Sequence, residues 1–106
     1  MTKPEKTIVI SLGGSLIVPN EIDWQFIKDF KHTIEKYIEK GYKFIIITGG
    51  GKTCRNYQNA AAEISDITNE DKDWLGIHSS RLNGHLLRTI FRDHAHPRIN
   101  NNPHDL

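Results

Sequence analysis

Two short aliphatic runs, each followed directly by glycines, constrain the fold of this chain more than any other feature. Residues 7–12 (TIVISL) precede Gly13 and Gly14, and residues 43–48 (KFIIIT) precede three further glycines. Runs of this length and composition are typical of strands that are buried in a sheet. One helical pattern lies between them, so we predict a strand–helix–strand unit with parallel strands and a right-handed crossover.

The segment between the two strands has the features of an amphipathic helix. Asp23 is suited to the N-cap position, and Gly41 is suited to the position just after the helix. Between them, Ile27, Phe30 and Ile34 recur at helical spacing. Residues 17–23 (IVPNEID) should form a loop, because proline and asparagine interrupt regular structure.

Two more helices are expected in the second half of the chain. They cover about residues 52–64 and 74–92, and the polar stretch SDITNEDKD is interpreted as a break between them. The last residues, HAHPRINNNPHDL, should form a loop or the entry to a third strand, because Pro97 and the asparagines disfavour a helix.

The predicted topology brings the two glycine loops together. The carboxyl ends of parallel strands lie at the same edge of a sheet, so LGGSL and TGGGK should lie side by side. In open α/β sheets this edge is where ligands bind. The sequence therefore predicts an α/β fold with a ligand site at the two loops.

The composition bounds what kind of protein this is. With 106 residues the chain can form one small domain, and its net charge of +1 disfavours both nucleic acid and membrane surfaces as partners. A single cysteine excludes an internal disulfide and fits a reducing, cytoplasmic setting. No apolar run approaches the roughly 18 residues that span a bilayer, and the N-terminus does not resemble a signal peptide.

The stretch TGGGKT resembles the end of a Walker A loop, but the motif does not fit. Its first glycine would fall at position 46, which is Ile46. A strand that ends in glycines and turns into a helix remains, and backbone N–H groups at a helix N-terminus bind phosphate. Glycine allows the close approach that such binding needs. Tight turns alone would explain one loop, whereas two converging loops with Lys52 and Arg55 beside them favour an anion or nucleotide site.

Three blocks of the sequence together resemble a known family. ISLGGSL, TGGGKTCRNYQNAA and DWLGIHSSRLNGHLLRTIF are similar to the amino acid kinase family, and within it to the archaeal-type uridylate (UMP) kinases. The resemblance implies a three-layer αβα sandwich with a mainly parallel sheet. Because those relatives run much further, it also implies that residues 1–106 form only the N-terminal portion of such a domain.

The resemblance assigns roles to matching positions. It implies that the ATP phosphates are bound by Gly14, Ser15, Gly51 and Arg55. It implies that UMP is bound by Gly50 and, through its ribose, by Asp73. The phosphate site would be supported by Gly13, Gly49 and Lys52. The catalytic residues are expected in the part of the domain that follows.

The implied reaction is transfer of the γ-phosphate of ATP to UMP to give UDP, with Mg²⁺ as cofactor. The relatives form hexamers, so a homo-oligomer is expected. Two alternatives remain open. One is a sister kinase with a carboxylate or carbamate acceptor, such as acetylglutamate kinase, although such enzymes usually have a lysine where this chain has Ser11. The other is a truncated, non-catalytic nucleotide-binding module.

A metal site formed by side chains is not expected. His94, His96 and His104 lie close together in the sequence, but no cysteine or carboxylate cluster accompanies them. We interpret them as solvated loop histidines rather than zinc ligands.

Overall fold

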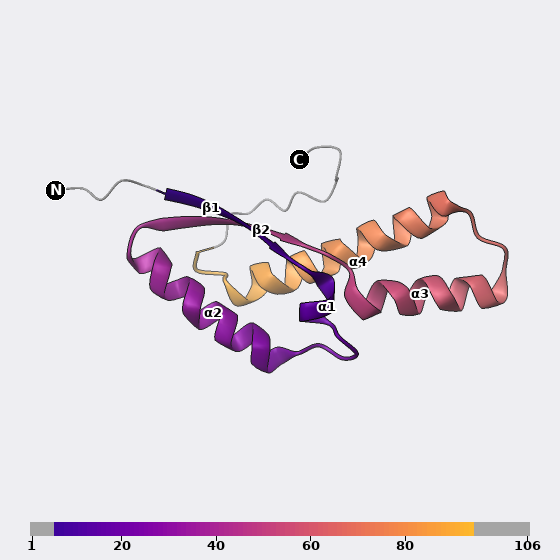
Figure 1. Ribbon diagram of the computed structural model, residues 1–106, viewed down its shortest axis with the longest axis horizontal. Coiled ribbons are helices and arrows are strands. Elements are labelled where there is room, and N and C mark those ends of the chain that lie inside the picture. Colours follow the sequence, from indigo (N-terminus) through magenta and orange to yellow (C-terminus); the bar gives the residue numbers. More distant parts are fainter. Residues whose placement is uncertain (1–5, 95–106) are drawn as a thin grey trace.

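The computed structural model describes residues 6–94 and forms a short parallel sheet with helices around it (Figure 1). Two helices lie between the two strands, and two more follow the second strand. In chain order the elements are β1 (Lys6–Leu12), α1 (Gly14–Ile17), α2 (Trp24–Glu39), β2 (Tyr42–Thr48), α3 (Gly51–Ile64) and α4 (Asn69–Ile90).

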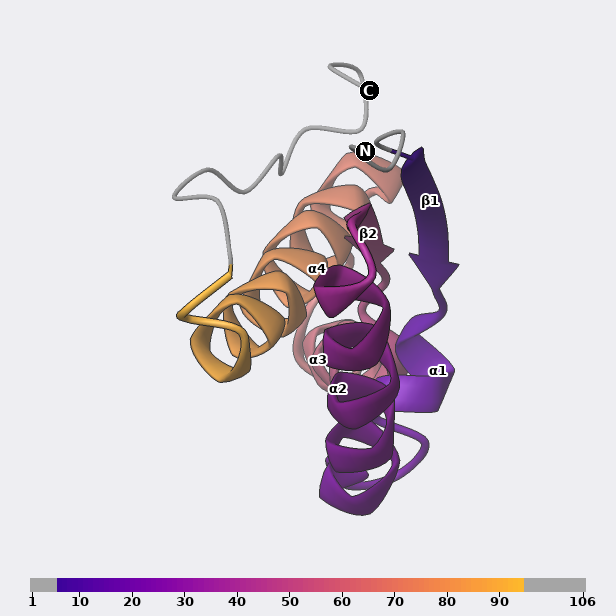
Figure 2. The same ribbon diagram turned by 90° about the vertical axis from the view of Figure 1, so that its left-hand side faces the viewer.

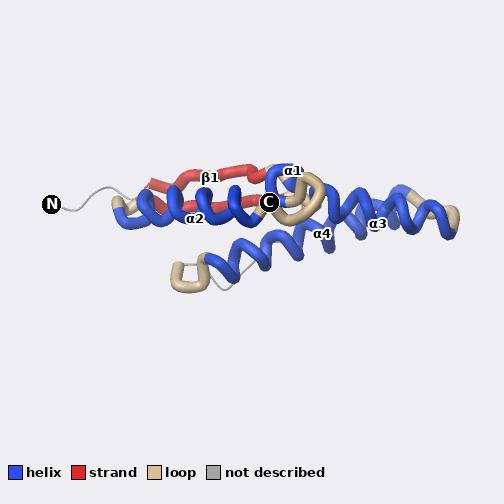
Figure 3. The backbone as a smooth tube through the Cα atoms, turned by 90° about the horizontal axis from the view of Figure 1, so that it is seen from below, coloured by secondary structure: helices blue, strands red, loops and turns tan. Residues whose placement is uncertain are grey.

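The predicted strand–helix–strand unit is confirmed. β1 and β2 pair in parallel, and their register runs from Lys6 opposite Tyr42 to Leu12 opposite Thr48. α2 connects them, so both strands end at the same edge of the sheet. Figure 3 shows the two strands side by side, leading to the middle of the molecule, where α1 and α3 begin.

α2 begins and ends as its sequence predicts. The Asp23 side chain accepts a hydrogen bond from the backbone N–H of Phe26, 3.1 Å away, which satisfies a donor that the helix itself cannot use. After the helix, Gly41 adopts a φ of 97°, a conformation that costs other residues free energy. These two residues therefore fix the length of the crossover.

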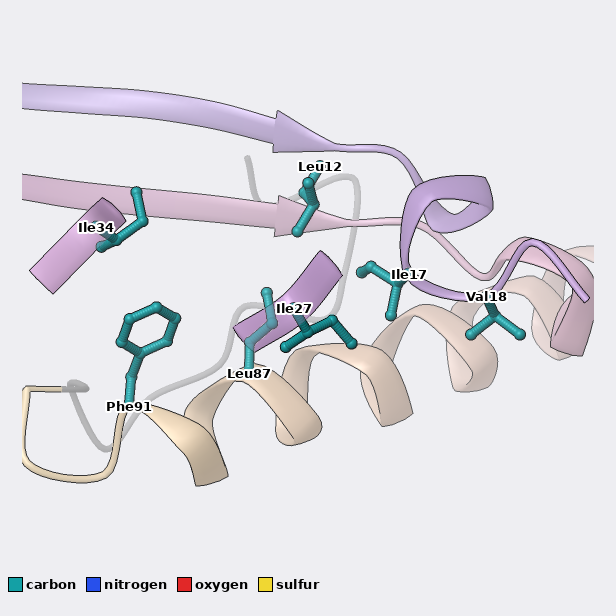
Figure 4. Packing of buried hydrophobic residues seen from close by; sticks show 7 residues of the cluster. All are labelled: Leu12, Ile17, Val18, Ile27, Ile34, Leu87 and Phe91. Atoms are coloured by element: carbon teal, nitrogen blue, oxygen red, sulfur yellow. The ribbon is translucent and has the colours of Figure 1, made fainter. Parts of the chain in front are cut away.

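The core lies between one face of the sheet and the helices α2 and α4 (Figure 2). Figure 4 shows Leu87 and Phe91 of α4 pointing toward α2 beneath the two strands. Phe91 also makes an edge-on ring contact with Phe30 of α2, with 6.3 Å between the ring centroids. The buried side chains of this cluster are Leu12, Ile17, Val18, Ile27, Ile34, Leu87 and Phe91.

The opposite face of the sheet is open in the described part of the chain. Val9 and Ile45, which face each other across the two strands, are 60% and 52% exposed. The parallel sheet of the predicted α/β sandwich is thus present, with helices on one of its faces.

The last helix begins earlier than the sequence analysis predicts. It was expected from residue 74, but α4 begins at Asn69 and ends at Ile90. Thr68 and Asp71 form a capping box: the Thr68 N–H donates to the Asp71 carboxylate at 2.9 Å, and the Asp71 N–H donates to the Thr68 hydroxyl at 3.0 Å. The polar stretch interpreted as a break therefore contains the start of the helix.

The short helix α1 was not predicted. After Gly13 the chain makes a single helical turn, closed by a 2.8 Å bond from the Val18 N–H to the Gly14 carbonyl. This turn buries Ile17, which is 0% exposed, and returns the chain toward α2. A lone turn of four residues has too little periodicity to be recognised from sequence.

Replacing Ile17 by alanine should destabilise the fold by about 2–4 kcal/mol, because it removes a completely buried side chain. Ile64→Ala is the matched control, since Ile64 is 83% exposed and its truncation should cost less than about 0.5 kcal/mol. Urea unfolding followed by circular dichroism measures both. Equal losses in the two variants would contradict the observed core.

The capping box makes the stability of α4 depend on pH. The two hydrogen bonds with Thr68 lower the pKa of Asp71 below the ordinary value of 3.8. A group with a lowered pKa in the folded state stabilises the protein above its unfolded pKa, and this contribution disappears as the pH falls through the folded-state pKa. Asp71→Asn should therefore be less stable than the parent at neutral pH, and the difference should vanish in acid. Urea midpoints of both chains between pH 7 and pH 2 test this, and a constant difference would contradict it.

Candidate functional site

The two glycine loops touch backbone to backbone at the carboxyl ends of β1 and β2. A Cβ placed on Gly14 would lie 2.6 Å from the carbonyl carbon of Gly49 and 2.7 Å from the nitrogen of Gly50. A Cβ on Gly49 would lie 3.0 Å from the nitrogen of Gly14. No side chain fits between the loops, so their glycines are required for this contact. The predicted juxtaposition of the loops is confirmed.

Gly51 is constrained in a second way. Its φ of +62° lies in the left-handed region, where a side chain is strained, and a Cβ there would also meet the backbone of Gly14. Gly13 differs from all of these. It is exposed, its φ is −56°, and a Cβ on it would have no atom within 4 Å. Gly13 therefore takes no part in the close contact between the loops.

Helix α3 begins inside the second loop. Gly50 is its N-cap and Gly51 its first residue, so the positive end of the dipole of this 14-residue helix lies at the glycine loops. The Lys52 N–H donates to the Val18 carbonyl at 2.9 Å. Among residues 6–94, the N–H groups of Gly50 and Gly51 donate to no carbonyl or side chain. They are therefore free to bind an anion.

Helix α4 holds the second loop from the other side. The Asn83 side-chain amide donates to the Gly49 carbonyl at 2.8 Å and to the Gly50 carbonyl at 3.3 Å. The Thr48 hydroxyl donates to the Ser80 carbonyl at 2.9 Å. Ser79 packs so closely that a Cβ on Gly50 would lie 2.9 Å from the Ser79 Cβ. Asn83 was not assigned a role from the sequence. The pattern that could have indicated one is a polar residue on the apolar face of a helix, because a buried polar side chain must find a hydrogen-bond partner.

The charged and polar residues that were predicted for the site lie on α1, α3 and α4. Lys52 is half-buried in the first turn of α3, while Arg55 is exposed one turn further on, and Ser15 is exposed in α1. Asp73 is exposed on α4 and lies six residues before Ser79, about 9 Å along the helix axis. At that level Gln58 of α3 donates to the Lys72 carbonyl of α4 at 3.0 Å and joins the two helices.

The structure has no metal cluster of its own in residues 6–94. No three His, Cys, Asp or Glu side chains of this part come close enough together to hold an ion. His94 lies 3.6 Å from the carboxylate of Glu35, measured from Nε2 to Oε2. His96 and His104 lie outside the described residues.

A parallel strand–helix–strand unit that ends in touching glycine loops, with a helix N-terminus and cations beside them, defines an α/β protein with a candidate ligand site at the carboxyl ends of its strands. The chain belongs to the amino acid kinase family, whose sequence model matches residues 6–101. No helix in the described range is long and apolar enough to cross a membrane.

Relatives within this family are similar over most of the chain. It is 37% identical over 91 residues to the uridylate kinase of Thermococcus sibiricus, a match that covers 85% of this chain and 39% of that protein. It is 36% identical over 93 residues to the uridylate kinase of Pyrococcus abyssi, covering 87% of this chain and 40% of that protein. The chain thus spans about two fifths of the length of the curated relatives it matches.

A solved structure of the same kind shares the fold. The crystal structure of uridylate kinase from Archaeoglobus fulgidus superposes with a TM-score of 0.64 at 36% sequence identity. The superposition covers 79% of this chain and 36% of that one. The resemblance to the archaeal-type uridylate kinases is therefore confirmed in both sequence and structure.

Alanine substitutions at two adjacent glycines should have very different effects on stability. Gly14→Ala forces the two loops apart, so we expect a loss of at least about 2 kcal/mol in the free energy of unfolding. Gly13→Ala puts its methyl group into open space at an ordinary φ, so its stability should stay within about 1 kcal/mol of the parent. Urea denaturation of the two variants distinguishes them, and an unchanged Gly14→Ala would show that the loops do not touch.

Proposed function

We propose that this chain is the N-terminal portion of a nucleoside monophosphate kinase that transfers the γ-phosphate of ATP to UMP and yields UDP. The observation that carries the proposal is the contact between Gly14 and the second loop, which leaves the Gly50 and Gly51 N–H groups free at a helix N-terminus. Such groups bind phosphate oxygens. The similarity to uridylate kinases over 85% of the chain supports the choice of UMP among phosphate-bearing substrates.

On the donor side, the ATP phosphates would be held by Gly14, Ser15, Gly51 and Arg55. Arg55 lies one turn into α3 and is exposed, so its guanidinium can reach a phosphate beside the loops and bind two oxygens at once. Lys52 adds positive charge in the first turn, and Gly13 and Gly49 would support the phosphate site as parts of the two loops. Mg²⁺ would be held mainly by phosphate oxygens, because residues 6–94 offer no cluster of ligating side chains.

On the acceptor side, UMP would lie between Gly50 and Asp73. The phosphate would bind at the loop, and the Asp73 carboxylate would accept hydrogen bonds from the ribose hydroxyls. The axial offset of about 9 Å between Ser79, which touches Gly50, and Asp73 is comparable to the extent of a nucleotide from its phosphate to its far ribose hydroxyls. A contact at each end would orient the acceptor phosphate toward the donor.

The part of the reaction that these residues serve is positioning and charge stabilisation. In phosphoryl transfer the protein forms few covalent bonds, and most of the rate enhancement comes from aligned groups and preorganised donors. The backbone N–H groups supply such donors without side-chain entropy. Since the chain covers 39% of its relative, we assign no catalytic residue within it.

Two other functions make different predictions for the same site. In an acetylglutamate kinase-like protein the acceptor would be a carboxylate or carbamate, and Asp73 would have no sugar to bind. In a non-catalytic module the chain would bind nucleotide without turnover. The similarity to uridylate kinases favours UMP over the first alternative. A homo-oligomer, as in the hexameric relatives, belongs to the same proposal.

Calorimetric titration of the 106-residue chain with UMP tests the proposal. We expect the parent to bind UMP, and Asp73→Ala to bind it roughly 10–100-fold more weakly, because hydrogen bonds to a charged group contribute about 1.5–3 kcal/mol. Asp29→Ala is the matched control, since Asp29 is an exposed carboxylate on α2, away from the loops. CMP and N-acetylglutamate serve as competing ligands.

The outcomes separate the two acceptors. UMP binding that depends on Asp73 and not on Asp29 supports the UMP site, which the uridylate kinase and the non-catalytic module share. Preferential binding of N-acetylglutamate would replace it with the sister kinase. If circular dichroism shows a folded chain that binds neither ligand, the proposal is wrong for this chain.

A further inference from the structure

A buried amide in the middle of α4 reaches across to the second glycine loop. Asn83 is 4% exposed, and its Nδ2 lies 2.8 Å from the Gly49 carbonyl oxygen and 3.3 Å from that of Gly50. Carbonyl oxygens only accept hydrogen bonds, so the atom that faces them must be the amide nitrogen, with its two donors. One side chain therefore holds two successive peptide groups of the loop.

Because of the geometry of the peptide bond, these hydrogen bonds also set the direction of two N–H groups. In a trans peptide the C=O and the N–H of the same unit point in opposite directions. The Gly49 carbonyl shares its peptide with the Gly50 N–H, and the Gly50 carbonyl shares its peptide with the Gly51 N–H. Since Asn83 draws both carbonyls toward α4, both N–H groups point away from α4.

As described above, the Gly50 and Gly51 N–H groups have no hydrogen-bond partner among residues 6–94. We propose that Asn83 is a positioning residue that aims the Gly50 N–H at the phosphate of UMP and the Gly51 N–H at the phosphates of ATP. This inference rests on the proposed function, because these phosphates would be those of the two nucleotides. Asn83 itself would touch no substrate, and it would act through the loop.

A run of three glycines needs hydrogen bonds from residues outside the loop to fix its conformation. Glycine has more accessible backbone conformations than any other residue, so a free loop would sample many orientations of its N–H groups. The flanks of the loop are fixed by the bonds from Thr48 to Ser80 and from the Lys52 N–H to the Val18 carbonyl. Of the peptide groups between these anchors, Asn83 holds the two whose carbonyls belong to Gly49 and Gly50, and the Gly50 carbonyl also accepts from the Cys54 N–H at 3.4 Å. Holding them before the ligand arrives lowers the entropy lost on binding.

A purely structural role would have a different signature. The glycines that accept from Asn83 are only half-buried, so water could satisfy their carbonyls if the amide were absent. In that case truncation of Asn83 would alter stability but would leave the directions of the two N–H groups and the affinity for phosphate unchanged. The two roles can thus be separated by experiment.

Residual dipolar couplings of the ¹⁵N-labelled chain measure the N–H directions without any ligand. We expect the Gly50 and Gly51 couplings of the parent to match N–H groups that point away from α4. In Asn83→Ala these two couplings should change, while those of α4 and β1 should not. Asn83→Asp keeps the volume but replaces the donors by acceptors, so it should produce the same change. Asn59→Ala, at an exposed asparagine of α3, is the matched control.

UMP titrations followed by the same amide resonances supply the functional readout. The parent should show shifts at Gly50, and both Asn83 variants should bind UMP at least roughly tenfold more weakly, because the loop must then be ordered at the expense of binding free energy. Asn59→Ala should bind like the parent. Tight binding by a folded Asn83→Ala with unchanged couplings would overturn the positioning role and leave the proposed function intact.

Two further outcomes also test the role of Asn83. If the parent binds no UMP, the proposed function fails, and the couplings of Asn83→Ala alone determine whether Asn83 orients the loop. If neither variant folds, the couplings of the parent decide, since N–H groups that point toward α4 would exclude the role.

Discussion

The contact between Gly14 and the second glycine loop is the constraint on which the rest of the site depends. The two loops pack backbone against backbone, so they can lie this close only if the residues at the contact lack side chains. Gly14, Gly49 and Gly51 meet this condition, and Gly51 also adopts the left-handed φ that turns the chain into α3. The position of the α3 N-terminus therefore follows from the absence of a few methyl groups.

Rigidity of the site comes in part from residues to which no ligand contact is assigned. The Val18 carbonyl, just after α1, accepts the Lys52 N–H of α3, and Asn83 and Ser79 of α4 lie on the opposite side of the loop. Both elements are held by the same core, because Ile17 and Leu87 belong to one buried cluster. Hydrophobic packing near α2 is thus linked physically to the orientation of peptide groups at the edge of the sheet.

The sequence predicts the parts of this structure that depend on local pattern. The strands, the cap at Asp23 and the glycine after α2 were predicted because each has its signal within a few residues. The start of α4 was missed because Thr68 and Asp71 lie in a stretch whose polarity suggested a break, although the capping box is itself a start signal. Asn83 could not be assigned a role, because its partners lie 33 and 34 residues away and depend on how α3 and α4 pack. The roles of Asp73 and Arg55 still rest on resemblance.

The open face of the sheet affects how the chain interacts with other protein molecules. Val9 and Ile45 form a cross-strand apolar pair in water, and in the described residues both strands have an unpaired outer edge. Such edges are templates for strand addition by another chain, and nearby apolar side chains strengthen the attachment. The protein concentration therefore determines whether the core or the open face has the larger effect on the behaviour of the chain. In dilute solution the core beneath the sheet sets its stability, whereas in concentrated solution the bare face and edges govern self-association and solubility.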